Sequence, residues 1–340
     1  MEDLDTTQLV AEATKNVTDI VNLAIEHDTD KQMLVIYDTE DELTRILTTA
    51  YKTAFPDAIY IDFNKVEKEE VLAAMADLEE DDLVVLVQSA DFRLSEFRIR
   101  LHLFERNIKV IDHRHLMRNT PDSYTTYIGA LGYDPEWYRG LGHKLKDRLA
   151  QTTELQIKSG EHTLTVTDGL EDPKPNLGDY KDMKNVGGTF PIGEVFTEAK
   201  DLANANGSLM IYSFADVNFN IAMHEPFRID ITDGLVTGWG ENAPQSFVDV
   251  IEKIKRTERA IMREIGFGLN RAITRENYIK DITAFERILG LHVSLGEKHT
   301  VYKKEGIRAK KTRYHVDLFL DVDCVLADGQ EIFKNGEYIL

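Results

Sequence analysis

Hydrophobic and polar residues follow two different spacings in the first part of the chain. Between about residues 6 and 26 the apolar positions recur at helical spacing, which predicts an amphipathic helix. Four short apolar runs follow, and each predicts a buried strand, at 33–37, 58–62, 83–87 and 108–111. Helical stretches that run to about Thr53 and from Lys68 to Leu78 lie between them. This alternation predicts an α/β domain with a mostly parallel sheet and helices on both faces.

The pattern changes after the glycines and mixed charges of residues 134–151. Short strands with frequent turns are then predicted, at 163–167, 209–213, 227–231 and 314–323. One helix is predicted from Ser246 to Met262, with an apolar stripe along one side. We therefore expect an α/β domain over residues 1–145, followed by a mixed α+β domain over residues 146–340 that carries the chemistry.

Length and charge narrow the choice of partners. A chain of 340 residues with 42% hydrophobic content can bury a substantial core, and its length fits two domains better than one. The formal net charge of −20 repels phosphate backbones and anionic lipids, so we expect neither nucleic acid nor a membrane as a partner. An acidic surface also increases solubility, so the charge does not identify a substrate.

Cysteine and glycine motifs exclude several kinds of site. Cys324 is the single cysteine, so the chain has no intramolecular disulfide and too few thiolates for a structural zinc site. Any metal must be held by oxygen and imidazole ligands. The glycine-rich motifs that bind nucleotide phosphates do not follow any predicted strand. The acidic N-terminus lacks the features of a secretory signal, and we expect a cytoplasmic protein.

A His-x-Asp motif lies in the last predicted strand. Because side chains alternate along a strand, His315, Asp317 and Phe319 share one face. An imidazole beside a carboxylate supplies two of the ligands that a divalent metal requires. On the motif alone, a solvated strand edge with two polar residues explains the same pattern.

Three further residues in this domain have side chains that bind metals. His292 lies within a mostly apolar run, Glu264 lies where the helical pattern gives way to glycines, and Glu194 follows a Pro-Ile-Gly turn. Each also has an ordinary structural interpretation. The histidine fits a core position with a polar partner, and the two glutamates fit a solvated helix end and a solvated turn.

Taken in this order, the segments resemble the aminopeptidase T/S family of metallopeptidases. Residues 185–197, Asn-Val-Gly-Gly-Thr-Phe-Pro-Ile-Gly-Glu-Val-Phe-Thr, resemble the family's Asn-x-Pro-x-Gly-Glu-Val-Phe-Thr segment. Residues 263–266 resemble its Gly-Glu-Ile-Gly segment, 292–296 its His-x-Ala-Leu-Gly segment and 315–317 its terminal His-Val-Asp. The resemblance covers about residues 180–335.

The resemblance implies a dinuclear site for Zn, Co or Mn, with one carboxylate bridging the two ions. Its ligands would be Glu194, Glu264, His292, His315 and Asp317. Two adjacent divalent ions can lower the pKa of a shared water and polarise a scissile carbonyl. The implied activity is removal of N-terminal residues from a peptide substrate, with Glu264 also acting in catalysis, and the implied assembly is a homodimer.

The chain departs from the family pattern at three points. His299 stands where the family has a tyrosine, seven residues after the first histidine, and Tyr302 lies slightly beyond; either residue could donate a hydrogen bond to a tetrahedral intermediate. Glu286 lies six residues before His292, where the family has a glutamate five before. The chain is also shorter than expected before Glu194.

The chain also resembles the dihydroxypyridine dioxygenases, which gives an alternative function. Such an enzyme holds one iron through two histidines and one carboxylate. His315 and Asp317 could supply this set with either His292 or His299. The two additional glutamates favour two metals over one. A third class is a repurposed metal-binding protein that keeps the fold.

Overall fold

The computed structural model describes residues 5–94, 98–181, 183–218, 221–307 and 312–340. The chain forms two compact units, and each unit is assembled from three separate segments. Unit 1 contains Met1–Arg139, Leu177–Ile192 and Arg271–Phe285, and unit 2 contains Gly140–Asn176, Gly193–Asn270 and Glu286–Leu340. Two later segments of the chain thus return to unit 1.

Unit 1 is built on the predicted parallel sheet, which is confirmed. Its five strands lie in the order β2 (Ile59–Asp62), β1 (Met33–Tyr37), β3 (Leu83–Val87), β4 (Lys109–His113) and β8 (Gly187–Thr189), and all pair in parallel. The strand β8 comes from a returning segment. A Cβ on Gly187, which has φ +92°, would lie 2.0 Å from the carbonyl oxygen of Val110 in β4. Only glycine permits this close approach.

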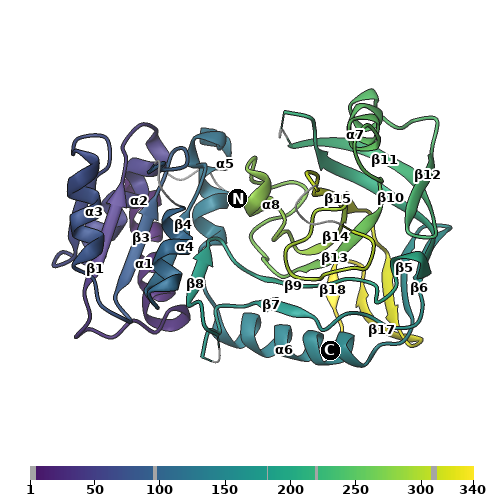
Figure 1. Ribbon diagram of the computed structural model, residues 1–340, viewed down its shortest axis with the longest axis horizontal. Helices are drawn as coiled ribbons and strands as arrows, with labels where there is room; N and C mark the ends of the chain where they lie inside the picture. The colour runs from purple at the N-terminus through teal and green to yellow at the C-terminus, as the bar shows by residue number, and fades with distance from the viewer. Residues whose placement is uncertain (1–4, 95–97, 182, 219–220, 308–311) are drawn as a thin grey trace. The chain divides into compact units, whose positions relative to one another are not determined.

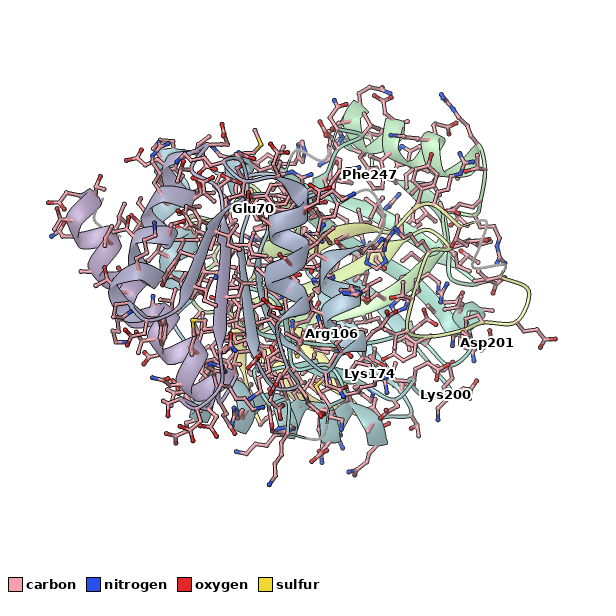
Figure 2. All side chains as sticks on the ribbon, turned by 60° about the vertical axis from the view of Figure 1, so that its left-hand side comes forward. Glu70, Arg106, Lys174, Lys200, Asp201 and Phe247 are labelled. Carbon is pink, nitrogen blue, oxygen red and sulfur yellow. The ribbon has the colours of Figure 1, made fainter. Side chains whose placement is uncertain are left out.

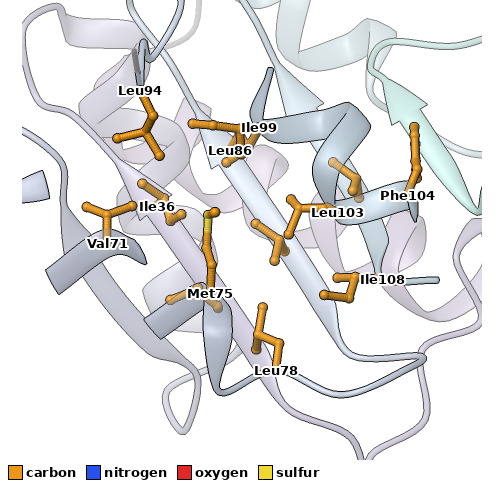
Figure 3. Close-up of a cluster of buried hydrophobic side chains, with 13 residues drawn as sticks. Ile36, Val71, Met75, Leu78, Leu86, Leu94, Ile99, Leu103, Phe104 and Ile108 are labelled. Carbon is orange, nitrogen blue, oxygen red and sulfur yellow. The ribbon is translucent and has the colours of Figure 1, made fainter. Parts of the chain in front are cut away.

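Helices cover both faces of the sheet in unit 1 (Figure 1). On one face, α3 (Lys68–Ala76) and α4 (Ile99–Glu105) pack on β1, β3 and β4 through a cluster of buried apolar side chains that includes Ile36, Met75, Leu86 and Leu103 (Figure 3). The alternate positions of the strands, such as Val35, are buried on the opposite face. There α2 (Glu42–Ala54) contacts β1 and β3, and it packs against α1 (Thr6–Asp19).

Besides α7, which is described below, the described residues form further helices. They are η1 (Ile20–Ala24), η2 (Leu116–Arg118), α5 (Pro121–Ala130), η3 (Glu136–Leu141), α6 (Gly142–Gln151), η4 (Leu202–Asn204) and α8 (Ile282–Phe285). Among the helices of the described residues, none has the length and apolar character that a membrane-spanning helix requires.

Unit 2 is dominated by a large, curled antiparallel sheet (Figure 1). The main path of this sheet runs β18 (Glu337–Tyr338), β17 (Gln330–Lys334), β16 (Cys324–Ala327), β5 (Leu155–Ser159), β6 (His162–Val166), β10 (Ala205–Ala215), β15 (Val316–Leu320), β14 (Gly290–Leu295), β13 (Met262–Gly268), β9 (Glu194–Thr197) and β7 (Lys174–Asn176). Strands β11 (Ile221–Thr232) and β12 (Leu235–Trp239) extend from β10. Each of the four strands predicted in this part of the chain overlaps a strand of this sheet: β6, β10, β11 and β15.

One helix of unit 2, α7 (Gln245–Lys255), is shorter than predicted. The apolar stripe is confirmed, because Phe247, labelled in Figure 2, is fully buried and its ring centroid lies 4.9 Å from that of Phe227. The predicted end at Met262 is wrong, since the helix ends at Lys255 and Met262 begins β13. Ala260 and Ile261 continue the apolar pattern of the helix in the sequence. In the structure they are buried residues that lead directly into β13, all of whose residues are buried.

The apolar cluster of unit 1 gives a test of packing. Leu103→Ala, in α4, is expected to lower the free energy of unfolding by about 2–5 kcal/mol, because it removes a fully buried side chain from a packed core. Leu101→Ala, in the same helix, is the matched control: its side chain is 49% exposed, so a change within about 0.5 kcal/mol is expected. Urea unfolding measures both, and equal effects would contradict the assigned packing.

Candidate metal centre

Four neighbouring strands of unit 2 bring the predicted ligands together. Glu194 begins β9, Glu264 lies in β13, His292 in β14 and Asp317 in β15. These strands are consecutive in the sheet, with antiparallel pairs between each neighbour. His315 immediately precedes β15. Residues that lie up to 123 positions apart in the sequence (317 minus 194) thus share one small region.

The ordinary interpretations of the two glutamates and of Asp317 are wrong. Glu264 is not a solvated helix end, because it lies within a strand and is 7% exposed. Glu194 is in strand β9 and 4% exposed, and Asp317 is also 4% exposed. His292 is fully buried, as a core histidine would be, but its neighbours are carboxylates. A buried charge needs a compensating partner, so these positions require an explanation.

The side chains form two groups that share one residue. The first group is Glu194, Glu264 and His292, and the second is Glu264, His315 and Asp317; within each group the potential ligand atoms all lie within 4.8 Å of one another. Nε2 of His292 is 3.3 Å from Oε1 of Glu194 and 3.5 Å from Oε1 of Glu264. Each group could hold one divalent ion, and Glu264 would bridge the two.

Three ligand atoms in these groups are buried without a hydrogen bond. They are Oε1 of Glu194, Nε2 of His292 and Oδ1 of Asp317, which have no hydrogen-bond partner within the described residues. Each such atom costs about 1–3 kcal/mol when it is left unsatisfied. Since the three belong to the two groups, bound cations would satisfy all of them.

The carboxylates create a strongly negative environment. Burial alone would lower the pKa of His292, but Glu264 and Glu194 outweigh burial and raise the pKa to about 9. Asp317 and Glu264 likewise overcome the burial of His315 and raise its pKa to about 10. Burial would raise the pKa of Glu264, yet its contacts with the imidazoles of His292 and His299 hold the pKa well below the usual value. The site therefore favours bound positive charge, whether protons or metal ions.

An arginine that the sequence analysis missed supports Glu194. Arg287 is buried, with Nη1 2.5 Å from Oε2 of Glu194 and Nη2 2.8 Å from Oε1 of Glu286. It therefore occupies one oxygen of Glu194 and leaves the other directed toward His292. Burial raises the pKa of Glu286 to about 8, against the opposing effect of Arg287. The structure brings Glu286 to Arg287 and not into either ligand group.

The two candidates for the family tyrosine occupy different positions. Nε2 of His299 lies 2.8 Å from Oε2 of the shared Glu264. The hydroxyl of Tyr302 donates instead to the backbone carbonyl oxygens of Asp172, at 2.8 Å, and Phe196, at 3.3 Å. Of the two, His299 is therefore the one that contacts the ligand groups.

A second missed residue is Gly266, which pairs with His292 between β13 and β14. A Cβ at this position would lie 2.1 Å from Cε1 and 2.2 Å from Nε2 of the imidazole. The glycine is thus required so that the His292 ring can lie flat against β13. The sequence carries a signal for it, because Gly266 follows Glu264 by two residues and so shares its face of the strand.

The comparisons place this arrangement among known folds. The sequence matches no protein-family profile, and no curated protein is significantly similar to it. Among solved structures, 2,5-dihydroxypyridine dioxygenase from Pseudomonas putida KT2440 aligns with a TM-score of 0.65 at 15% identity, over 99% of this chain and 98% of that one. AmpT from Thermus thermophilus aligns with a TM-score of 0.62 at 12% identity, over 97% and 99%. The chain therefore shares its fold with a dioxygenase and with AmpT. At sequence identities of 15% and 12%, this similarity shows the fold and does not assign the activity of either protein to this chain.

Substitution of Gly266 tests the geometry of the ligand groups. Gly266→Ala is expected to displace the His292 imidazole and to weaken binding of Zn²⁺ or Mn²⁺ by about 10- to 100-fold, because the ring that supplies the ligand atom can no longer keep its place. Titration calorimetry measures this affinity. Gly140→Ala is the control, since a Cβ there meets nothing within 4 Å. Unchanged affinity in Gly266→Ala would refute the placement of His292 as a ligand.

Proposed function

We propose that the chain is a metal-dependent aminopeptidase with a dinuclear site. The observation that carries this proposal is that two three-residue ligand groups share Glu264. A single-metal site needs only one such group, and the second group would then have no role as a set of ligands. The fold that the chain shares with AmpT supports the same function.

The residues present fit a pair of divalent ions. Glu194 and His292 would hold the first ion, His315 and Asp317 the second, and Glu264 would contact both. This set of oxygen and imidazole ligands suits Zn²⁺, Co²⁺ or Mn²⁺. Ions of this kind, when bound in pairs, polarise a carbonyl and lower the pKa of a water molecule.

Other residues of the site would position the ligand carboxylates and take part in proton transfer. Arg287 fixes Glu194 through Oε2, so that the carboxylate presents a single oxygen, and His299 holds Oε2 of the shared Glu264. When a peptide occupies the site, His299 would donate a hydrogen bond to a tetrahedral intermediate in place of its contact with Glu264, and a carboxylate near the ions would accept a proton from the attacking water. The buried carboxylates would attract the cationic terminal amine of a peptide, and we therefore expect a preference for free N-termini.

The alternative function is a mononuclear iron dioxygenase that cleaves a dihydroxypyridine-type ring. The shared fold with 2,5-dihydroxypyridine dioxygenase favours it, and the two histidines and one carboxylate that it needs would be His315 and Asp317 of the second group with either His292 of the first group or His299. A mononuclear iron site would give Glu194 and its partner Arg287 no role in metal binding. A third possible function is metal binding without catalysis. It would differ from the two enzymatic functions in that the metal-loaded protein turns over no substrate.

Peptides with and without a free amine test the proposed activity. With Zn²⁺, Co²⁺ or Mn²⁺, the protein is expected to release the N-terminal residue from free dipeptides and to leave their N-acetylated counterparts intact. Liquid chromatography of the products measures both. Equal cleavage of the two sets would contradict an aminopeptidase, and no cleavage of either set with any of the three metals would contradict a peptidase.

Substitution of Asp317 tests its role as a ligand. Asp317→Ala is expected to lower turnover by more than about a hundredfold, because the second ligand group loses its carboxylate, while circular dichroism shows an unchanged fold. Asp147→Ala, an exposed aspartate of unit 2, is the control and should keep full activity. An Asp317→Ala variant with normal turnover would exclude Asp317 from the site.

Substitution of His299 distinguishes a positioning role from a ligand role. His299→Phe is expected to lower turnover about 10- to 100-fold and to reduce the metal content much less, because His299 contacts Glu264 and lies outside both ligand groups. Turnover and elemental analysis are measured on the same sample, with His299→Gln tested for partial rescue through its amide donor. A parallel loss of metal and turnover would show instead that His299 is a ligand.

A further inference from the structure

Unit 1 contains a second site with different chemistry. A cavity of about 690 Å³ opens at the carboxyl ends of the parallel strands β3 and β4 and extends to the first turn of α4. In open sheets of this kind, ligands often bind at the carboxyl ends of the strands. Every described residue that lines the cavity belongs to unit 1, so it is built independently of the ligand groups in unit 2.

Arginines dominate the polar lining of this cavity. Among the described residues, the lining includes Arg93, Arg98, Arg100 and Arg114 and two carboxylates, Asp91 and Asp112. The described part of the lining therefore has a formal charge of +2 (four minus two), although the whole chain carries −20. A concentration of positive charge in so acidic a protein favours an anionic ligand.

Two of these arginines are already engaged within the protein. Arg114 binds Asp91 through both nitrogens of its fork, at 2.7 and 3.0 Å. Nη1 of Arg100 donates to Oγ1 of Thr189 at 2.5 Å and lies 3.4 Å from Asp112. Each of the two carboxylates, Asp91 and Asp112, is thus paired with one of these arginines. Burial raises the pKa of Asp112 to about 6.

The other two arginines, Arg93 and Arg98, are exposed side chains in the lining of the cavity. Neither makes an ion pair with any residue in the described ranges. A guanidinium presents paired N–H donors that match the two oxygens of a carboxylate or phosphate. Two such groups at one cavity can bind an anionic group between them.

The cavity also has an apolar wall. Phe92 lines it and stacks on Phe63, with ring centroids 4.2 Å apart and planes 15° from parallel. Leu94 and Ile99 lie in the same lining. An inorganic anion would leave this wall in contact with water, whereas an organic anion with an aromatic or aliphatic part would cover it.

We propose that this cavity binds a small organic anion, with Arg93 and Arg98 holding its carboxylate or phosphate and Phe92 contacting its apolar part. The proposal does not depend on the activity of unit 2. Phenyl phosphate and benzoate serve as probes for the two kinds of anionic group, and inorganic phosphate tests the contribution of the apolar part.

Titration calorimetry with the full-length, metal-loaded protein tests this assignment. At least one organic probe should bind with a Kd below about 1 mM. Arg93→Ala and Arg98→Ala, which alter exposed side chains, should each weaken binding about tenfold. Arg45→Ala, an exposed arginine on α2, and Asp317→Ala, in the metal site, should leave the affinity unchanged.

Three results would overturn the proposal. The first is no binding of either organic probe up to about 10 mM. The second is binding that survives in the Arg93→Ala, Arg98→Ala double variant but is lost in Asp317→Ala, because the probe would then occupy the metal site. The third is inorganic phosphate binding as tightly as phenyl phosphate, which would remove the role of the apolar wall.

Discussion

The sharing of Glu264 between two ligand groups is the constraint on which the rest of unit 2 depends. Buried carboxylates and imidazoles at this density are costly in any protein unless cations or hydrogen bonds compensate them. The antiparallel register of β9, β13, β14 and β15 places these side chains together, since each strand contributes one ligand residue and His315 immediately precedes β15. The sheet thus places ligands from distant parts of the sequence at the spacing that metal coordination needs.

Neighbouring residues make this arrangement specific. Arg287 neutralises one oxygen of Glu194 and leaves the other for a metal, and His299 does the equivalent at Glu264. Gly266 permits the approach of the His292 ring to the neighbouring strand. These contacts orient Glu194, Glu264 and His292 before any ion binds, which is the usual role of residues that surround a metal site.

The sequence predicted some parts of this structure better than others. Short apolar runs located four of the five parallel strands of unit 1, because local pattern determines such elements, whereas the short Gly-Gly-Thr strand β8 has no apolar run. The helix end at Met262 was wrong, since a buried strand such as β13 is as apolar as a helix stripe. The return of Leu177–Ile192 and Arg271–Phe285 to unit 1, and the contact of Arg287 with Glu194, depend on long-range packing that no local pattern encodes.

The number of metal ions bound per chain tests the central claim most directly. Elemental analysis of the native protein, combined with its measured concentration, gives this number without any assumption about substrate. If Glu264 bridges two sites, about two divalent ions per chain are expected. One iron per chain would instead favour the dioxygenase, and no bound metal, even after incubation with Zn²⁺, Co²⁺ or Mn²⁺, would contradict the account of this site.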